Sequence, residues 1–352
     1  MKITRRTTAL TALGLAVMML AGCASASADQ NGADLAEVRV GYFANVTHAP
    51  ALVGISEGLL QDALGDVELK AEVLGAGPAA IEALSAGAID AAYIGPNPAI
   101  NTFIQSGGQS VNIIAGATSG GAALVVDDEI TGIDDLRGST IATPQLGNTQ
   151  DVALRSWLTD EGLATSVSGG GDVNITPTEN ALTFTLLQDG GVDGAWLPEP
   201  WVSRLVVEAG ATVLVDERDL WDDGAFPTTV LLVRADFARQ HPDAVDDLLA
   251  GHIASVQWLA DNAGQAPAVI NSALEEATGK GLSDEVLTRA LQNVTFTVDP
   301  HAETFERLVQ NGLTAGTQKD GSIDGLFDLR ALNAQLTDGG QEAVSAAGLG
   351  AD

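Results

Sequence analysis

The chain has 352 residues, enough for two domains, and 16 lysines and arginines against 47 aspartates and glutamates give a formal net charge of −31 at pH 7. Hydrophobic residues make up 45% of it and charged residues 18%, which excludes an intrinsically disordered chain because so much apolar surface would collapse. The acidic balance, with four lysines in total, excludes ordinary nucleic-acid binding, which needs clustered cations.

Residues 1–23 have the pattern of an export signal. Three basic side chains within the first six residues precede an apolar run, over about 9–20, that is too short to span a bilayer. The run ends in Leu20-Ala-Gly-Cys23, which resembles the lipobox of bacterial lipoproteins. We therefore expect lipidation at Cys23, which would anchor the protein to the extracytoplasmic face of the cell membrane; the alternative is a plain secretory signal. Residues 24–36 are mostly small and polar, which predicts a flexible tether.

From residue 37 onward, short apolar runs alternate with helical patterns. This order predicts an α/β fold with a largely parallel sheet. Strands are expected at 38–42, 67–74, 91–94 and 111–117, with helices between them at 50–60, 79–86 and 98–105.

A second cycle starts after the polar stretch Asp127-Asp128-Glu129, where we expect the chain to enter a second lobe. Strands are expected at 140–142, 173–176, 194–197, 212–215 and 229–233, with helices at 133–137, 149–161 and 181–187. Residues 242 to about 347 are mostly helical in pattern, and His252 lies on an apolar stripe as a packed core histidine. The predicted lobes are 37–126 plus 229–352, and 127–228.

Two segments 103 residues apart repeat one pattern, which supports two similar lobes. In each, a helix ends at a glycine (Gly87, Gly190), an aspartate follows three residues later (Asp90, Asp193), and a short apolar strand runs into a proline-containing loop. Glycine suits the left-handed helix C-cap, and aspartate can anchor the turn. Open α/β sheets bind ligands at the carboxyl ends of their strands, so both loops are expected to face a cleft.

Two further strand-to-helix turns carry small polar residues. Unpaired N–H groups at a helix N-terminus, with the helix dipole, make a site for an anionic group without any lysine. The alternative is that these residues only cap their helices. They are Asn45, Thr47 and His48 before Pro50, and Gly147, Asn148 and Thr149 in the second lobe.

The sequence offers little support for catalysis. It contains no Gly-x-Ser-x-Gly elbow, no Walker loop and no dinucleotide-binding turn after a strand, and His48 is the only histidine near a predicted site. The single cysteine and four scattered histidines do not form a metal-binding pattern. We therefore expect no enzyme activity, no metal and no cofactor.

Several of these segments together resemble a known family. They are the lipobox, residues 41–52, Ala86-Gly-Ala-Ile-Asp90, Gly147-Asn-Thr149 and Trp196-Leu-Pro-Glu-Pro-Trp201. In combination they resemble the substrate-binding lipoproteins of ABC importers, in the branch for aliphatic sulfonates, taurine and nitrate, over about residues 38–336. The resemblance implies a two-lobed periplasmic-binding-protein fold of the second type, with crossings near Asp127 and Thr228. It also implies a monomer that closes on one small solute and delivers it to a membrane permease and its ATPase.

Carried over by position, the resemblance implies ligand contacts from loops of both lobes. No arginine or lysine falls in these loops, so amides, hydroxyls and dipoles would have to hold a strong anion. Glu199 could instead accept a hydrogen bond from an amine, and Trp196 and Tyr93 could stack on a flat ring. A small pyrimidine or aromatic solute is therefore the alternative ligand, and a sensor lipoprotein the alternative role. The implied contacts are Asn45, Thr47, His48, Gly75, Gly77, Gly95, Pro96, Asn97, Gly147, Asn148, Thr149, Trp196 and Glu199.

Overall fold

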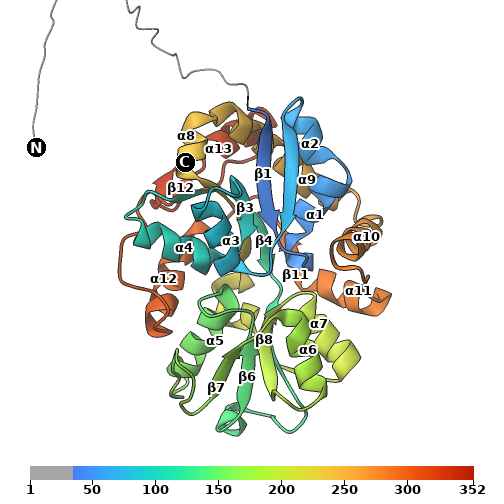
Figure 1. Cartoon of the computed structure of the whole chain (residues 1–352), viewed down its shortest axis with the longest axis vertical. Helices are drawn as coiled ribbons and strands as arrows, with labels where there is room; N and C mark the ends of the chain where they lie inside the picture. The colour runs from blue at the N-terminus through green and yellow to red at the C-terminus, as the bar shows by residue number, and fades with distance from the viewer. Residues whose placement is uncertain (1–34) are drawn as a thin grey trace, which may run out of the picture. The chain divides into compact units, whose positions relative to one another are not determined.

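The computed structural model describes the unit formed by residues 35–352 (Figure 1). The expected export signal, Cys23 and most of the tether lie outside the described residues. Two β-sheets divide the unit into lobe 1, residues 35–120 and 227–352, and lobe 2, residues 121–226. None of the helices between residues 35 and 352 combines the length and the apolar character needed to cross a bilayer.

Lobe 1 is built on a mixed sheet. Its strand order is β2 (Glu68–Val73), β1 (Glu37–Tyr42), β3 (Ala91–Ile94), β10 (Pro227–Arg234), β4 (Val111–Gly120), β12 (Phe327–Asp328) and β13 (Gly350–Ala351), with β11 (Val294–Phe296) also paired to β4. One group of contacting helices comprises α1 (Ala49–Ser56), α2 (Leu59–Leu64), α9 (Pro242–Asp261) and α10 (Ala266–Thr278); another comprises α3 (Gly77–Ser85), α4 (Pro96–Gln105) and α12 (Phe305–Thr314). The remaining helices are α8 (Ala235–Gln240), α11 (Asp284–Gln292) and α13 (Arg330–Asp338).

Lobe 2 has the strand order β7 (Asn174–Pro177), β6 (Thr140–Thr143), β8 (Gly194–Pro198), β5 (Ala122–Val126) and β9 (Thr212–Asp216). Its helices are α5 (Thr149–Asp160), α6 (Asn180–Gln188) and α7 (Trp201–Ala209). Successive residues of β8 point to opposite faces, as strand geometry requires. Trp196 packs in the same apolar cluster as Leu154 and Leu158 of α5, whereas Leu197 packs with Val202 and Leu205 of α7.

The α/β expectation is confirmed, but the sheets are mixed rather than largely parallel. The strands β5 and β10 run antiparallel to both of their main neighbours. The chain enters each of these strands from the other lobe. A strand that is parallel to its neighbour is instead reached through a crossover connection, usually a helix, within the same lobe. The stretch expected to be mostly helical also contributes two short strands, β11 and β12, to the lobe 1 sheet.

The expected first crossing near Asp127 is wrong by one strand. The chain passes between sheets at Gly120-Gly121, and residues 122–126, assigned to the first lobe from the sequence, pair with β8 and β9 of lobe 2. Both glycines have a positive φ, 77° and 78°, which side chains other than glycine rarely adopt. The polar stretch at Asp127 is the turn that follows β5. The second crossing enters β10 at Pro227, beside the predicted Thr228.

The internal repeat is present in the structure. The side chain of Asp90 accepts a hydrogen bond from Arg39 N–H of β1 at 3.0 Å, and Asp193 accepts one from Thr140 N–H of β6 at 2.6 Å. In each lobe the aspartate therefore ties the strand that it precedes to the neighbouring parallel strand. The repeat accordingly delivers the ends of β3 and β8 to the region between the lobes.

His252 is a core residue, as its apolar stripe predicts. It is fully buried in α9, with Nε2 2.7 Å from the Gly116 carbonyl oxygen and Nδ1 3.0 Å from the Tyr93 hydroxyl. A carbonyl only accepts, so Nε2 carries the proton and Nδ1 accepts from tyrosine. Burial lowers the pKa of His252 to about 4.

This histidine predicts a loss of stability in mild acid. Between its unfolded pKa of 6.5 and its folded pKa of about 4, the unfolded chain binds a proton that the folded chain does not. The free energy of unfolding therefore falls as pH is lowered through this window. We expect His252→Gln, whose amide can still donate to Gly116, to lose less stability between pH 7 and 5 in urea unfolding. Equal losses in the two proteins would contradict this.

Candidate functional site

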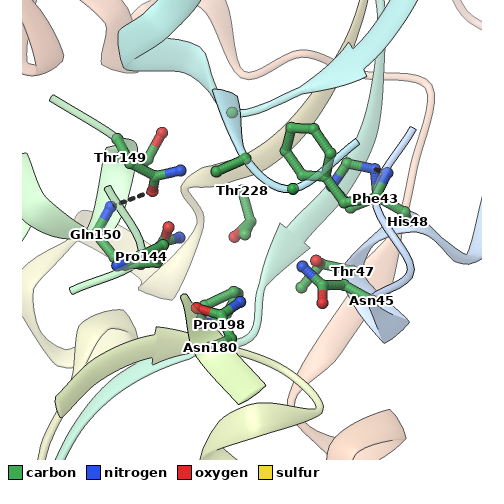
Figure 2. Close-up of a pocket in the computed structure, with 14 residues that line it drawn as sticks. Phe43, Asn45, Thr47, His48, Pro144, Thr149, Gln150, Asn180, Pro198 and Thr228 are labelled. Atoms are coloured by element: carbon green, nitrogen blue, oxygen red, sulfur yellow. Dashed lines mark hydrogen bonds between the residues drawn. The ribbon is translucent and has the colours of Figure 1, made fainter. Parts of the chain in front are cut away.

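A cavity lies between the two lobes, at the carboxyl ends of strands from both sheets (Figure 2). The empty space between its lining atoms, including its open mouth, is about 340 Å³. This is near the lower end of the range for small-molecule sites. Lobe 1 contributes Phe43, Asn45, Thr47, His48, Gly75, Ala76, Gly95 and Thr228, and lobe 2 contributes Pro144, Asn148, Thr149, Gln150, Asn180 and Pro198.

Helix N-termini surround this cavity. The lining includes the N-cap residues Ala76 of α3, Gly95 of α4 and Asn148 of α5, and the first residue of α6, Asn180. A short 3-10 turn, η1 (Val46–His48), leads directly into α1 on the same side. The first N–H groups of a helix have no partner within it, and the helix dipole adds a partial positive charge. The cavity therefore attracts negative charge from several directions.

The described residues that line the cavity include no aspartate, glutamate, lysine or arginine. The one ionisable side chain among them, His48, is 2% exposed, and burial lowers its pKa to about 3. Its Nδ1 accepts a hydrogen bond from Phe43 N–H at 3.3 Å, which places the ring proton on Nε2. At neutral pH this site is thus uncharged and rich in donors.

In two of the asparagines that line the cavity, a hydrogen bond to the side-chain oxygen fixes the orientation of the amide. Asn148 Oδ1 accepts a hydrogen bond from Gln150 N–H at 3.2 Å, so Asn148 caps α5 as well as lining the cavity. Asn45 Oδ1 accepts one from the indole Nε1–H of Trp201, at 2.9 Å. In both amides the NH₂ group is left free to donate toward a solute.

Thr149 carries the clearest unmet hydrogen-bonding capacity. It is 3% exposed, and its Oγ1 has no hydrogen-bond partner within residues 35–352; the same holds for Asn180 Oδ1, also on the cavity wall. Buried polar side chains are normally paired, so an unpaired hydroxyl on a cavity wall is placed for a bound molecule.

A buried ion pair between Asp151 and Arg155 stabilises the turn that leads into Thr149. The Asp151 carboxylate accepts hydrogen bonds from Gly147 N–H (2.9 Å), the Thr143 hydroxyl (2.9 Å) and Arg155 Nε (3.0 Å). Arg155 in turn donates to the Ser166 carbonyl oxygen at 2.8 Å. Gly147, predicted as a ligand contact, instead forms the turn at φ 77° and does not line the cavity.

Seven of the predicted contacts line the cavity together: Asn45, Thr47, His48, Gly75, Gly95, Asn148 and Thr149. Gly77, Pro96 and Asn97 do not, although each lies one or two residues beyond a lining residue. The Asn97 amide turns away to donate to the Leu308 carbonyl oxygen of α12 at 3.2 Å. A helix rotates successive side chains by about 100°, which takes these positions off the wall.

Trp196, predicted as a ligand contact that could also stack on a flat ring, does not line the cavity. Trp196 lies within β8, fully buried; its Nε1 donates to Glu217 at 2.8 Å, and its ring lies 5.8 Å from that of Trp157. Tyr93 is also fully buried and bonds to His252. Both aromatics sit inside strands and face a core.

Glu199, which was also predicted as a ligand contact, does not line the cavity either. Its carboxylate is 1% exposed and accepts from Ser203 N–H (3.0 Å), Ser203 Oγ (2.9 Å), Asn293 Nδ2 (2.7 Å) and Arg289 Nη1 (3.4 Å). Asn293 and Arg289 belong to lobe 1, so Glu199 bridges the lobes beside a separate small cavity. Burial raises its pKa, and the four donors oppose that rise.

Sequence reasoning missed several lining residues. They are Phe43, Pro144, Gln150, Asn180, Pro198 and Thr228. Asn180 begins the helix after β7, the same strand-to-helix position as the turns that were found, so its position was a usable signal. Thr228 comes from the crossing strand β10, where no local pattern marks a site.

Within residues 35–352, no three histidine, cysteine, aspartate or glutamate side chains are grouped so that they would hold a metal ion.

The sequence matches the model of one family and several curated proteins. The model of the NMT1-like family matches residues 31–273. A taurine-binding periplasmic protein of Escherichia coli K12 is 30% identical over 172 residues, which are 48% of this chain and 50% of that protein. The chain thus spans about half the length of this relative.

Solved structures share the fold at low sequence identity. An alkanesulfonate-binding protein from Xanthomonas axonopodis pv. citri, bound to MOPS, superposes with a TM-score of 0.68 at 19% identity, over 82% of this chain and 96% of that one. The periplasmic nitrate-binding protein of Synechocystis PCC 6803 gives 0.64 at 16% identity, over 80% and 81%. The expected two-lobed periplasmic-binding-protein fold is confirmed.

Proposed function

The chain belongs to the NMT1-like family, and from this premise we propose that it captures a small oxyanion outside the cytoplasm. The solute is a sulfonate, a taurine-like compound or nitrate, delivered to the permease and ATPase of an ABC importer. One observation carries the proposal: a cavity between two lobes, uncharged and surrounded by helix N-termini, with the Thr149 hydroxyl unpartnered on its wall.

The lining favours binding over catalysis. His48 is neutral and already accepts a hydrogen bond, and the buried carboxylates of Asp151 and Glu199 are occupied by donors outside the cavity. None of the lining groups within residues 35–352 is thus placed to move a proton or attack a substrate. The alternative of a ring-shaped solute loses the two residues that suggested it, because Trp196 and Tyr93 are both in the core, and Phe43 is the aromatic residue among the described lining residues.

A screen of thermal stability tests the proposal directly. The purified protein would be heated with alkanesulfonates, taurine, nitrate and bicarbonate, and with pyrimidines and aromatic acids for comparison. A solute at about 100 times its dissociation constant adds about 2.7 kcal/mol to the free energy of unfolding, which a melting curve resolves. We expect a rise with at least one oxyanion. A rise with ring compounds alone would contradict the proposal.

We further propose that a lipid on Cys23 anchors a monomer to the extracytoplasmic face of the membrane. The Leu20-to-Cys23 pattern after an apolar run supports this. In the producing bacterium, wild-type protein is expected to take up labelled fatty acid and to fractionate with membranes, whereas Cys23→Ala protein is not. Equal labelling of both proteins would contradict the anchor.

A further inference from the structure

We propose that apolar side chains around the mouth of the cavity hold an aliphatic chain of the solute, whose anionic group lies inside. The inference rests on the proposed function, because it concerns the solute of the same cavity. It favours alkanesulfonates with a chain of several carbons over nitrate. The side chains that form this apolar rim are Val73, Leu146 and Leu182.

Three of the four large hydrophobic side chains that are exposed within residues 35–352 belong to this rim. The four are exposed by 44% to 53%, and each rim residue lies two positions from a residue that lines the cavity. Two residues of chain span at most about 7 Å, so all three lie beside the opening. Single exposed hydrophobic residues are ordinary, but a group of them around one cavity indicates a surface that binds something apolar.

Lobe 2 contributes two of the rim residues. Leu146 lies in the loop between Pro144 and Asn148, which both line the cavity. It is 47% exposed, so its side chain does not enter the core beneath that loop. Leu182, 53% exposed, lies in the first turn of α6, about 3 Å further along the helix axis than the cavity residue Asn180.

Val73 is the lobe 1 member of the rim. It ends β2, the edge strand of the lobe 1 sheet, and it precedes the cavity residues Gly75 and Ala76. Because the other two rim residues belong to lobe 2, an aliphatic chain held by the rim contacts both lobes. Such a chain therefore stabilises the closed arrangement together with the anionic group.

The interior of the cavity suits the anionic group better than the chain. Thr149 Oγ1 and Asn180 Oδ1 are unpartnered on its wall, and methylene groups packed against them would leave both without a hydrogen bond. The space between the lining atoms is about 340 Å³ with the mouth included. A chain of several carbons is thus expected to extend outward, to the rim.

Linear alkanesulfonates of increasing length test the inference. Calorimetric titration of methane-, propane-, pentane- and octane-1-sulfonate into the wild-type protein should show affinity that rises with length. The gain should be about two- to fourfold for each methylene group that reaches the rim, where fourfold corresponds to full burial.

Serine substitutions at the rim locate the gain. The double variant Leu146→Ser, Leu182→Ser should bind methanesulfonate like the wild type, because neither residue lines the cavity, and octane-1-sulfonate at least about tenfold more weakly. Val167→Ser is the matched control. Val167 is 47% exposed, but it lies in the loop before β7, at the opposite end of that strand from Asn180. This control should keep both wild-type affinities.

The outcomes separate the two proposals. Affinity that stays constant or falls as the chain lengthens would overturn the inference and leave the oxyanion function standing. A gain with length that the double variant keeps would overturn the assignment of the rim. Failure of every alkanesulfonate, and of nitrate and bicarbonate, to bind would contradict the proposed function itself.

Discussion

Replacing Gly95 with valine weakens solute binding by about 100-fold while the fold stays intact. A Cβ atom at this position would lie 2.4 Å from Thr149 Oγ1 and 3.3 Å from Thr149 Cβ, closer than packed atoms tolerate. Gly95 lies in lobe 1 and Thr149 in lobe 2, so the contact forms when the cavity closes. If the threonine rotates to make room, its hydroxyl leaves the cavity, and binding suffers in that case too.

Calorimetry gives the affinity of this variant, and small-angle scattering with and without solute gives its closure. The backbone at Gly95, φ −70° and ψ 153°, suits valine, so no loss of fold is expected. Gly264→Val is the matched control, since nothing lies within 4 Å of a Cβ built there. A Gly95→Val protein that binds and closes like the wild type would disprove the interlobe contact.

The second large effect is on stability: Asp151→Asn lowers the free energy of unfolding by about 3–5 kcal/mol. Asp151 and Arg155 are both fully buried, and the substitution leaves the Arg155 guanidinium charge without its partner. The new amide also turns its NH₂ group toward Gly147 N–H or Arg155 Nε–H, both of which can only donate and need an acceptor. Urea unfolding at pH 7 measures the loss.

An exposed ion pair provides the comparison. Arg330 and Asp328 are bonded at 2.6 Å, but their side chains are 70% and 35% exposed. Asp328→Asn should therefore cost less than about 1 kcal/mol. If Asp151→Asn and Asp328→Asn lower the free energy of unfolding equally, burial of the ion pair between Asp151 and Arg155 does not account for its effect on stability.

Local patterns predicted much of this molecule. The alternation of short apolar runs and helical periods predicts both sheets, and the strand-to-helix turns at Asn45 and Asn148 predict opposite walls of one cavity. These features are local, because strand and helix periods and N-cap chemistry act within a few residues. His252 was assigned to the core on the same ground.

The predictions that were wrong concern features that are set by contacts between segments distant in the sequence. The direction of Trp196 is set by the alternation within β8, and the direction of Glu199 by donors on Arg289 and Asn293, about 90 residues away. Likewise β5 is a lobe 2 strand because it pairs with β8 and β9, and nothing in residues 122–126 themselves reveals this. The hydrogen bond from Trp201 to Asn45 likewise joins two lobes and could not be predicted from either segment alone.

The most direct test of the central claim, an uncharged interlobe cavity that binds an oxyanion, is a calorimetric titration of propane-1-sulfonate and nitrate into the wild type and two Thr149 variants. We predict one-to-one binding of at least one anion, at least about tenfold weaker binding by Thr149→Ala because a hydrogen bond to a charged group is lost, and near-normal binding by Thr149→Ser. No binding of either anion, or equal affinities in the wild type and Thr149→Ala, would contradict the claim.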